Sequence, residues 1–338
     1  MKAIVVDKDY GSATKEELET VRKAFAAAGI ELELFHFTSE SEIIEGCREA
    51  EAILCTGNPP VTRRVMEALP KLKYIQRFGI GVNSIDLDAA AEMGKVVLNI
   101  PGFCAKELAD LAIAMIMGLI RNTVYYDREI RKGNWPKCTY LLPPDVREMT
   151  LGLYGFGTAG QQLYRIFNGG FGTRVIACDP YLPKDVKAYF ADVTFVDFET
   201  LLKESDILSI HVGLTKETHH IFNEATFRKM KNNALIINTA RGPIIDQRAL
   251  AKALESGEIR GAGLDTMEVE PIESDDPLLQ MDNVILSAHC GSYGTRAKKE
   301  QLAAVCRLIP QAVTEKKLSA RNVANKAVMK RELGFVFE

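Results

Sequence analysis

Short apolar runs alternate along the chain with longer segments in which apolar residues recur every three or four positions. The short runs predict buried strands, and the longer spacing predicts helices with one apolar face. The segment over 14–29 shows the helical spacing, and Gly29 is a natural end for it. The strands expected from the short runs lie over 2–7, 51–56, 73–78, 95–100, 151–157, 174–179, 206–212, 234–240, 261–266 and 283–289.

This alternation determines the expected fold class. Near-continuous apolar strands between helices indicate parallel sheets covered on both faces, so we expect an α/β protein. The strands fall into two series, divided near Pro101 and Gly102, where a strand stops before a long helical segment. The helical tail is expected to return to the first series. The prediction is two doubly wound parallel-sheet domains, 1–100 plus 291–338 and 101–290, with a ligand-binding cleft between them.

Composition and charge exclude several classes of function. The chain has 338 residues, of which 47% are hydrophobic and 26% charged, as in ordinary folded proteins. Its formal charge of −3 provides no positive field for nucleic acid or an anionic membrane. Seven scattered cysteines without a CxxC pair predict neither a disulfide framework nor a metal site. The longest apolar run is too short for a membrane span and no signal peptide is recognised, so we expect a cytoplasmic protein.

A glycine-rich turn follows the strand expected over 151–157. Gly155, Gly157 and Gly160 have the GxGxxG spacing, which permits a tight turn, close approach of a pyrophosphate and close packing of helix on strand. Asp179 ends the next expected strand and lies 24 residues after Gly155. A carboxylate there can accept hydrogen bonds from ribose hydroxyls and repels a 2′-phosphate, which favours NAD over NADP. A simple turn at Asp179-Pro180 is the alternative.

Polar residues also follow three other expected strands. Arg241 comes after 234–240, Asp265 and Glu270 lie at and beyond the end of 261–266, and His289 ends 283–289. Each has an ordinary alternative, namely a surface ion pair, a loop or capping acid, or a strand-end histidine. In an open α/β sheet, however, ligands bind outside the carboxyl ends of the strands, where these side chains would meet.

Taken in order, these motifs resemble the NAD-dependent D-isomer-specific 2-hydroxyacid dehydrogenases, which include D-lactate, glyoxylate/hydroxypyruvate and 3-phosphoglycerate dehydrogenases. The matching stretches are "RFGIGVNSID", "GFGTAG", Asp179, "IHVGLTKETHHIFN", "NTARG", "GLDTMEVEP" and "SAHCG". The resemblance implies a Rossmann-type cofactor domain and a flavodoxin-like substrate domain. It also implies an oxidoreductase that interconverts a small D-2-hydroxy acid and its 2-keto acid by hydride transfer.

The resemblance further implies roles for particular residues. His289 would be the acid and base, Glu270 would hydrogen-bond its imidazole and favour the protonated form, and Arg241 would bind the substrate carboxylate. Backbone N–H groups of Gly79, Ile80 and Gly81 would bind the same carboxylate. The residues implied for cofactor binding are Gly155, Gly157, Thr158, Ala159, Gly160, Asp179, Val212, Gly213, Thr218, Thr239, Ala240, Arg241, Asp265, His289 and Gly291.

Substrate and partners stay open at this point. The loop over 55–62 carries no cation, which disfavours a phosphorylated substrate, yet a 3-phosphoglycerate dehydrogenase is retained as an alternative. A second alternative is a non-enzymatic, dinucleotide-sensing module like a corepressor relative of the family. Aromatic residues that would either wall a pocket or belong to the core are Phe78, Trp135, Tyr140 and Tyr293. A homodimer is expected, formed through the helix over 102–120 and the segment over 135–150.

Overall fold

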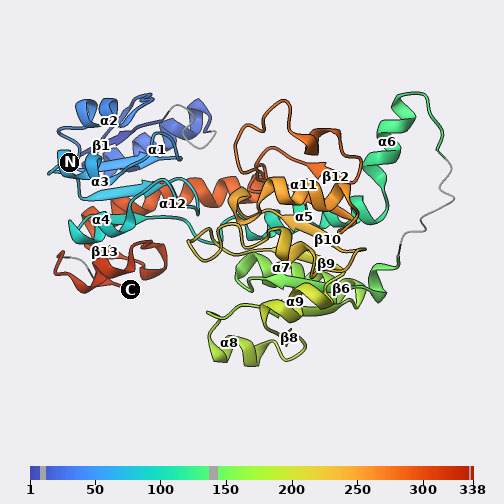
Figure 1. Cartoon of the computed structure of the whole chain (residues 1–338). Coiled ribbons are helices and arrows are strands. Elements are labelled where there is room, and N and C mark those ends of the chain that lie inside the picture. Colours follow the sequence, from blue (N-terminus) through green and yellow to red (C-terminus); the bar gives the residue numbers. More distant parts are fainter. Residues whose placement is uncertain (8–12, 137–143, 335) are drawn as a thin grey trace. The chain divides into compact units, whose positions relative to one another are not determined.

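The computed structural model of the protein describes residues 1–7, 13–136, 144–334 and 336–338. The chain forms two compact units: unit 1 comprises Met1–Phe103 and Thr295–Glu338, and unit 2 comprises Cys104–Gly294 (Figure 1). The predicted divisions, after 100 and after 290, lie three and four residues from these ends. Each unit contains a parallel sheet with helices, so the prediction of an α/β fold is confirmed.

Unit 1 is built on a five-stranded parallel sheet of order β2-β1-β3-β4-β5. This is the flavodoxin-like order, in which the chain starts near the middle and winds outward in both directions. The strands are β1 (Lys2–Val5), β2 (Glu31–Leu34), β3 (Ala52–Cys55), β4 (Tyr74–Arg77) and β5 (Val96–Leu98). The helices are α1 (Lys15–Ala27), α2 (Glu40–Gly46), α3 (Arg63–Ala68), α4 (Leu87–Glu92) and α12 (Thr295–Thr314).

The predicted helix over 14–29 is α1, and its ends follow from local chemistry. Thr14 caps the helix: its hydroxyl accepts a bond from Glu17 N, and the Glu17 carboxylate accepts one from Thr14 N. This reciprocal pair satisfies donors that the first helical turn leaves unpaired. Val21 and Phe25 are buried beneath the helix. Gly29 follows with φ of +71°, a conformation that glycine adopts without steric cost.

Strand β2 was not predicted from the pattern. Its sequence ELEL has no buried residue, because it lies at the edge of the sheet and pairs only with β1. An edge strand does not need a continuous apolar run, so a search for such runs misses it.

The C-terminal segment of the chain completes unit 1. Val323 forms an antiparallel bridge to Leu98 of β5, and the Asn325 side chain pairs with the backbone of Val97 and Lys95. On either side of this stretch in the chain, β13 (Lys317–Leu318) and β14 (Val336–Phe337) pair as a two-stranded sheet. The tail therefore extends along the free edge of β5.

Unit 2 is built on a seven-stranded parallel sheet of order β12-β11-β10-β9-β6-β7-β8. The order reverses between β6 and β9, which is the switch point where open α/β sheets bind ligands. The strands are β6 (Thr150–Tyr154), β7 (Arg174–Cys178), β8 (Thr194–Phe195), β9 (Ile207–Ile210), β10 (Leu235–Asn238), β11 (Gly261–Leu264) and β12 (Val284–Leu286). The helices are α5 (Ala105–Ile120), α6 (Thr123–Arg131), α7 (Thr158–Ile166), α8 (Lys184–Tyr189), α9 (Phe198–Glu204), α10 (Glu224–Phe227) and α11 (Gln247–Glu255).

Alternate residues of these strands supply two cores, one on each face of the sheet. Leu208 and Ile236 belong to one cluster, whereas Ile207 and Ile237 belong to the other, together with residues of α5. Among the described residues no single helix has the length and apolar character of a membrane span. Helices α5 and α6 meet the criterion only as a pair bent by 66°. Much of α5 is buried, including Ala109, Ala112 and Ile116.

Candidate active site

The glycine-rich turn of unit 2 joins β6 to α7 and uses its glycines in two ways. Gly155 has φ of +95°, and a Cβ on it would lie 2.8 Å from the carbonyl carbon of His211. A Cβ on Gly160 would lie 2.6 Å from the Gly155 carbonyl oxygen. Gly157 has open space where its Cβ would stand. Packing therefore requires the outer two glycines, and the middle one leaves room for a ligand at the exposed start of α7.

Thr158, Ala159 and Gly160 form the first turn of α7, and the Thr158 side chain is exposed. Asp179 lies beside this turn, at the end of β7. Its carboxylate accepts hydrogen bonds from Phe156 N at 2.9 Å and from Tyr181 N at 3.1 Å. The two bonds anchor the side chain, and its oxygens keep further lone pairs for ribose hydroxyls.

The segment after β9 runs past the glycine turn. His211 Nε2 lies 2.9 Å from Ser209 Oγ, and burial lowers the pKa of His211 to about 4, so this imidazole is neutral at neutral pH. Val212 also lies against the turn, because a Cβ on Gly155 would meet its Cγ1 at 2.9 Å. Further on, Thr218 Oγ1 donates to Gly213 O at 2.8 Å and thereby folds the loop back.

Arg241 is presented by a buried asparagine at the end of β10. The Asn238 side chain accepts from Ala240 N at 3.0 Å and donates to Arg241 O at 2.8 Å. The Thr239 hydroxyl is buried and has no hydrogen-bond partner among the described residues, which suits a polar ligand group. Sequence reasoning did not identify Asn238, although an asparagine ending an apolar strand is a usable signal.

The turn that follows Arg241 packs tightly on the loop that carries Glu270. A Cβ on Gly242 would lie 1.9 Å from the Met267 carbonyl oxygen, so only glycine allows this contact. The guanidinium of Arg241 donates to Ala240 O at 2.6 Å. The close packing brings the Arg241 loop and the Glu270 loop together.

His289 and Glu270 are in direct contact: Nδ1 lies 2.8 Å from Oε2, and the two side chains are 48% and 40% exposed. Met267 N donates to the other carboxylate oxygen at 3.1 Å. Burial raises the pKa of Glu270, but the His289 hydrogen bond and charge, the Met267 N–H and the Arg241 charge lower it further, so the net shift is downward. The structure thus brings Arg241, Glu270 and His289 together within unit 2, with the carboxylate ionised at neutral pH.

Asp265 anchors the loop that carries His289. It is 1% exposed, and its carboxylate accepts from Ser287 Oγ at 2.6 Å, Cys290 N at 2.8 Å and Gly291 N at 2.9 Å. Its carbonyl oxygen accepts from His289 N at 2.8 Å. His289 has φ of +51°, so the loop needs such anchoring. Contact of Asp265 and Gly291 with a cofactor stays a prediction, and the anchoring role was not foreseen from sequence.

A second imidazole–carboxylate pair lies two residues from Glu270. His220 Nε2 is 2.7 Å from Glu268 Oε1, and the other Glu268 oxygen accepts from Gln247 N at 3.2 Å. Glu268 N donates in turn to Gln247 Oε1 at 2.9 Å. Sequence reasoning did not single out Glu268 or Gln247. Together they fasten the Glu270 loop to the segment after β9 and to the start of α11.

The remaining predicted residues are the loop of unit 1 proposed to bind the substrate carboxylate and four aromatic residues. Gly79, Ile80 and Gly81 form the loop after β4. Phe78 is buried beside them, whereas Trp135 and Tyr293 are exposed. Tyr140 lies outside the described residues. None of the three described aromatic residues is shown to wall a pocket.

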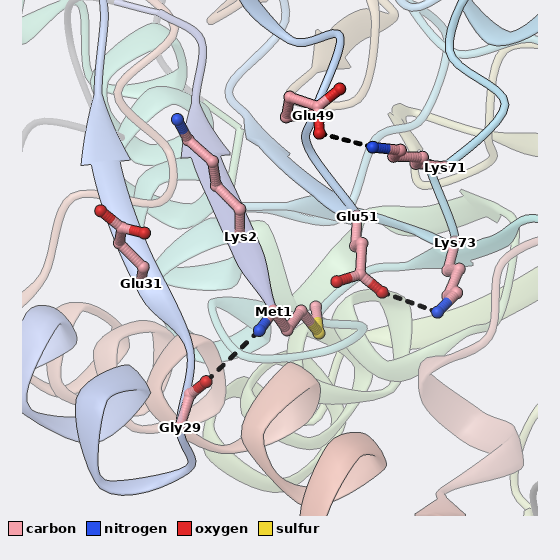
Figure 2. Close-up of a pocket in the computed structure, with 8 residues that line it drawn as sticks. All are labelled: Met1, Lys2, Gly29, Glu31, Glu49, Glu51, Lys71 and Lys73. Carbon is pink, nitrogen blue, oxygen red and sulfur yellow. Dashed lines mark hydrogen bonds and ion pairs between the residues drawn. The ribbon is translucent and has the colours of Figure 1, made fainter.

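A cavity of about 650 Å³ in unit 1 is lined by residues at the amino ends of β1, β3 and β4. Four of its charged side chains form two ion pairs: Figure 2 shows Lys71 with Glu49 and Lys73 with Glu51. It contains no residue predicted to bind substrate or cofactor. Among the residues that the structure describes, no group of three or more His, Cys, Asp and Glu is placed to hold a metal.

Comparison with known proteins gives matches along most of the chain. Residues 113–291 match the family model described as "D-isomer specific 2-hydroxyacid dehydrogenase, NAD binding domain". A glyoxylate reductase of Korarchaeum cryptofilum is 39% identical over 271 residues, which cover 79% of this chain and 81% of that protein. A D-3-phosphoglycerate dehydrogenase of Methanocaldococcus jannaschii is 34% identical over 96% of this chain, but over only 59% of its own length.

A solved structure gives the same result for the fold. The crystal structure of a glyoxylate reductase from Paecilomyes thermophila matches with a TM-score of 0.82 at 29% identity, over 93% of this chain and 96% of that one. The predictions of an oxidoreductase with an NAD-binding domain are confirmed, and the matches do not support the non-enzymatic alternative. The chain belongs to the D-isomer specific 2-hydroxyacid dehydrogenase family, whose enzymes use NAD or NADP and act on small 2-hydroxy and 2-keto acids.

Proposed function

We propose that this enzyme reduces small 2-keto acids of the glyoxylate and hydroxypyruvate class to D-2-hydroxy acids with NADH, and catalyses the reverse oxidation. The observation that carries the proposal is the His289–Glu270 pair. Nδ1 of the half-exposed imidazole is engaged at 2.8 Å, and Nε2 has no partner among the described residues. A ring nitrogen with this arrangement is suited to exchange a proton with a ligand.

The imidazole carries out the proton transfer. A bound nicotinamide coenzyme would supply or accept the hydride at C2 of the substrate. In reduction, Nε2 of His289 donates a proton to the keto oxygen, and in oxidation it accepts the hydroxyl proton. The ionised carboxylate of Glu270 accepts the Nδ1 hydrogen bond, so it fixes the orientation of the ring and directs Nε2 away from Glu270.

The substrate carboxylate is assigned to two sets of donors. The planar guanidinium of Arg241 provides paired N–H groups, which match a carboxylate in geometry and charge. The backbone N–H groups of Gly79, Ile80 and Gly81 are the second set. The first set is supported by the packing of Gly242, which follows Arg241, on the loop that carries Glu270, and by the effect of the Arg241 charge on the Glu270 carboxylate.

NAD is proposed as the coenzyme because of Asp179. Its carboxylate is anchored beside the glycine turn and carries a negative charge where a 2′-phosphate would approach. The cofactor groove would continue along Val212, Gly213, Thr218, Thr239 and Ala240, as the family resemblance implies.

The decisive measurement is the fall of NADH absorbance with a panel of keto acids: glyoxylate, hydroxypyruvate, pyruvate, phenylpyruvate, 2-ketoisocaproate and phosphohydroxypyruvate. The proposal expects the highest kcat/KM with glyoxylate or hydroxypyruvate. Absence of turnover with every acid, for protein that binds NADH, would contradict it.

One observation keeps a phosphoglycerate-type substrate as a second candidate. The loop over 55–62 lacks a cation, but the guanidinium of Arg77 lies beside it and donates to Cys55 O at 3.3 Å. A positive charge at the carboxyl end of β4 is available to a second anionic group. Preference for phosphohydroxypyruvate over hydroxypyruvate in the same panel, lost in Arg77→Gln, would favour this candidate.

We also propose a homodimer formed through unit 2, with α6 and Trp135 at the contact. The helix predicted for this contact, over 102–120, is less suited to it, because much of α5 is buried. Helix α6 has no buried residue, and its apolar side chains Val124 and Ile130 are 38% and 49% exposed. Trp135, a few residues later, is 80% exposed. Exposed apolar side chains along one segment are typical of a surface that another protein subunit covers. Sedimentation that shows only a 37.4 kDa species would exclude the dimer.

A further inference from the structure

The loop over 78–81, which we call the glycine loop, has its carbonyl oxygens held by hydrogen bonds from side chains around it. Asn99 Nδ2 donates to the carbonyl oxygen of Ile80 at 2.7 Å, and Arg77 Nε donates to that of Gly81 at 2.6 Å. Both donors come from the carboxyl ends of neighbouring strands, β5 and β4. They restrain the second half of the loop.

The first half is restrained in the same way. The side-chain amide of Gln301, on α12, donates to the carbonyl oxygen of Phe78. Ile100 N donates to the carbonyl oxygen of Gly79 at 3.0 Å. All four carbonyl oxygens of the glycine loop are therefore engaged within unit 1.

Most backbone N–H groups of the loop, unlike its carbonyl oxygens, have no hydrogen-bond partner among the described residues. Phe78 N donates to Cys55 O at 3.1 Å, but the N–H groups of Gly79, Ile80 and Gly81 have no acceptor among the described residues. Backbone donors without partners are rare in folded proteins unless water or a ligand binds them. Consecutive free N–H groups form a concavity that favours an anion.

The two observations are connected through the peptide planes. In a trans peptide the C=O of one residue and the N–H of the next point in opposite directions. Holding the Ile80 carbonyl therefore fixes the direction of Gly81 N–H, and holding the Phe78 carbonyl fixes that of Gly79 N–H. Because glycine tolerates a wide range of backbone angles, these planes would rotate easily if the carbonyls were released.

Asn99 is itself fastened by the C-terminal segment. Its backbone N–H donates to Asn322 O at 2.9 Å, and Asn322 Nδ2 donates to Asn99 O at 2.9 Å. Gln301 also belongs to the C-terminal part of unit 1. The last portion of the chain thus acts on the glycine loop through two amide side chains.

We propose that Asn99 and Gln301 are positioning residues that keep the N–H groups of the glycine loop directed toward the substrate carboxylate. The inference rests on the proposed function of this loop. Neither side chain needs to contact substrate. Each side chain holds a carbonyl oxygen directed away from the substrate carboxylate. An N–H group, rather than a repelling carbonyl oxygen, therefore faces the anion.

The test uses Asn99→Leu and Gln301→Met in the full-length enzyme, since both remove the amide donor with little change in volume. We expect KM for glyoxylate to rise about tenfold in each variant, while kcat falls less and the Kd for NADH stays within about twofold. Such a split separates loss of substrate positioning from general damage to the protein.

Two control variants match these substitutions. Asn325→Leu removes an amide that holds the same C-terminal segment to β5 without touching the loop. Gln311→Met changes a partly exposed glutamine on the same helix as Gln301. We expect Asn325→Leu to lower Tm without raising KM, and Gln311→Met to change neither.

Unchanged KM in both Asn99→Leu and Gln301→Met would overturn the inference, as would an equal rise of KM in Asn325→Leu. These outcomes leave the proposed function intact, because the wild-type enzyme would still reduce glyoxylate. Failure of the wild-type enzyme to reduce any 2-keto acid would instead remove both proposals.

Discussion

The imidazole of His289 and the carboxylate of Glu270 meet at 2.8 Å, although 19 positions separate them in the chain. They sit on the loops that follow two adjacent parallel strands, β12 and β11. The loops after parallel strands emerge at the same edge of the sheet, so the strand order brings these two side chains together. The first prediction concerns this contact.

Replacing His289 by alanine should reduce kcat by at least about a hundredfold, because the substitution removes the imidazole that is proposed to transfer the proton. The Kd for NADH, measured by fluorescence titration, should stay nearly constant. His219→Ala is the matched control, since that exposed imidazole has no carboxylate partner among the described residues. Full activity in His289→Ala would refute the assigned role.

Coenzyme choice should depend on Asp179. Asp179→Ala removes the charge that opposes a 2′-phosphate, so the ratio of kcat/KM for NADPH to that for NADH should rise about tenfold or more. The substitution also removes two backbone contacts. Asp197→Ala, which removes the cap of α9, controls for a simple loss of stability. An unchanged coenzyme ratio in Asp179→Ala would contradict the ribose role.

Asp265 should matter for both stability and turnover. Asp265→Asn places an amide where a buried carboxylate accepts three hydrogen bonds, so at least one N–H group is left unpaired. We expect the free energy of unfolding to fall by about 2 kcal/mol, with a lower kcat because the His289 loop loosens. Denaturant unfolding and steady-state kinetics measure the two effects. The exposed cap variant Asp145→Asn should show neither.

Stability should also fall in mild acid through His211. Burial lowers the pKa of this imidazole from 6.5 to about 4, so between these values the unfolded chain binds a proton that the folded protein does not. The contribution is fully present above pH 6.5 and is lost as pH falls toward 4, by at most about 3 kcal/mol. Denaturant unfolding of wild type and His211→Gln across this range isolates it. Parallel curves for the two proteins would exclude the effect.

Local patterns along the chain were sufficient for the fold class and for the glycine turn. Apolar runs and helical spacing depend on which faces are buried, and Gly160 is required by its contact with Gly155 in the same turn. Gly155 is required by the segment at His211, but the short glycine spacing already identified it. The predicted strand ends were less accurate. The strand expected over 283–289 ends at Leu286, because the Asp265 carboxylate draws the following residues into a turn.

The sequence by itself determined which chemical groups lie at the strand ends, since residue type and short spacing are properties of the chain alone. Only the tertiary structure decided which of those groups are partners: Asp265 anchors the His289 loop, Glu268 holds His220, and Asn99 holds Ile80. These pairs depend on strand order and on the path of the C-terminal segment, and both are set by packing between residues far apart in the chain.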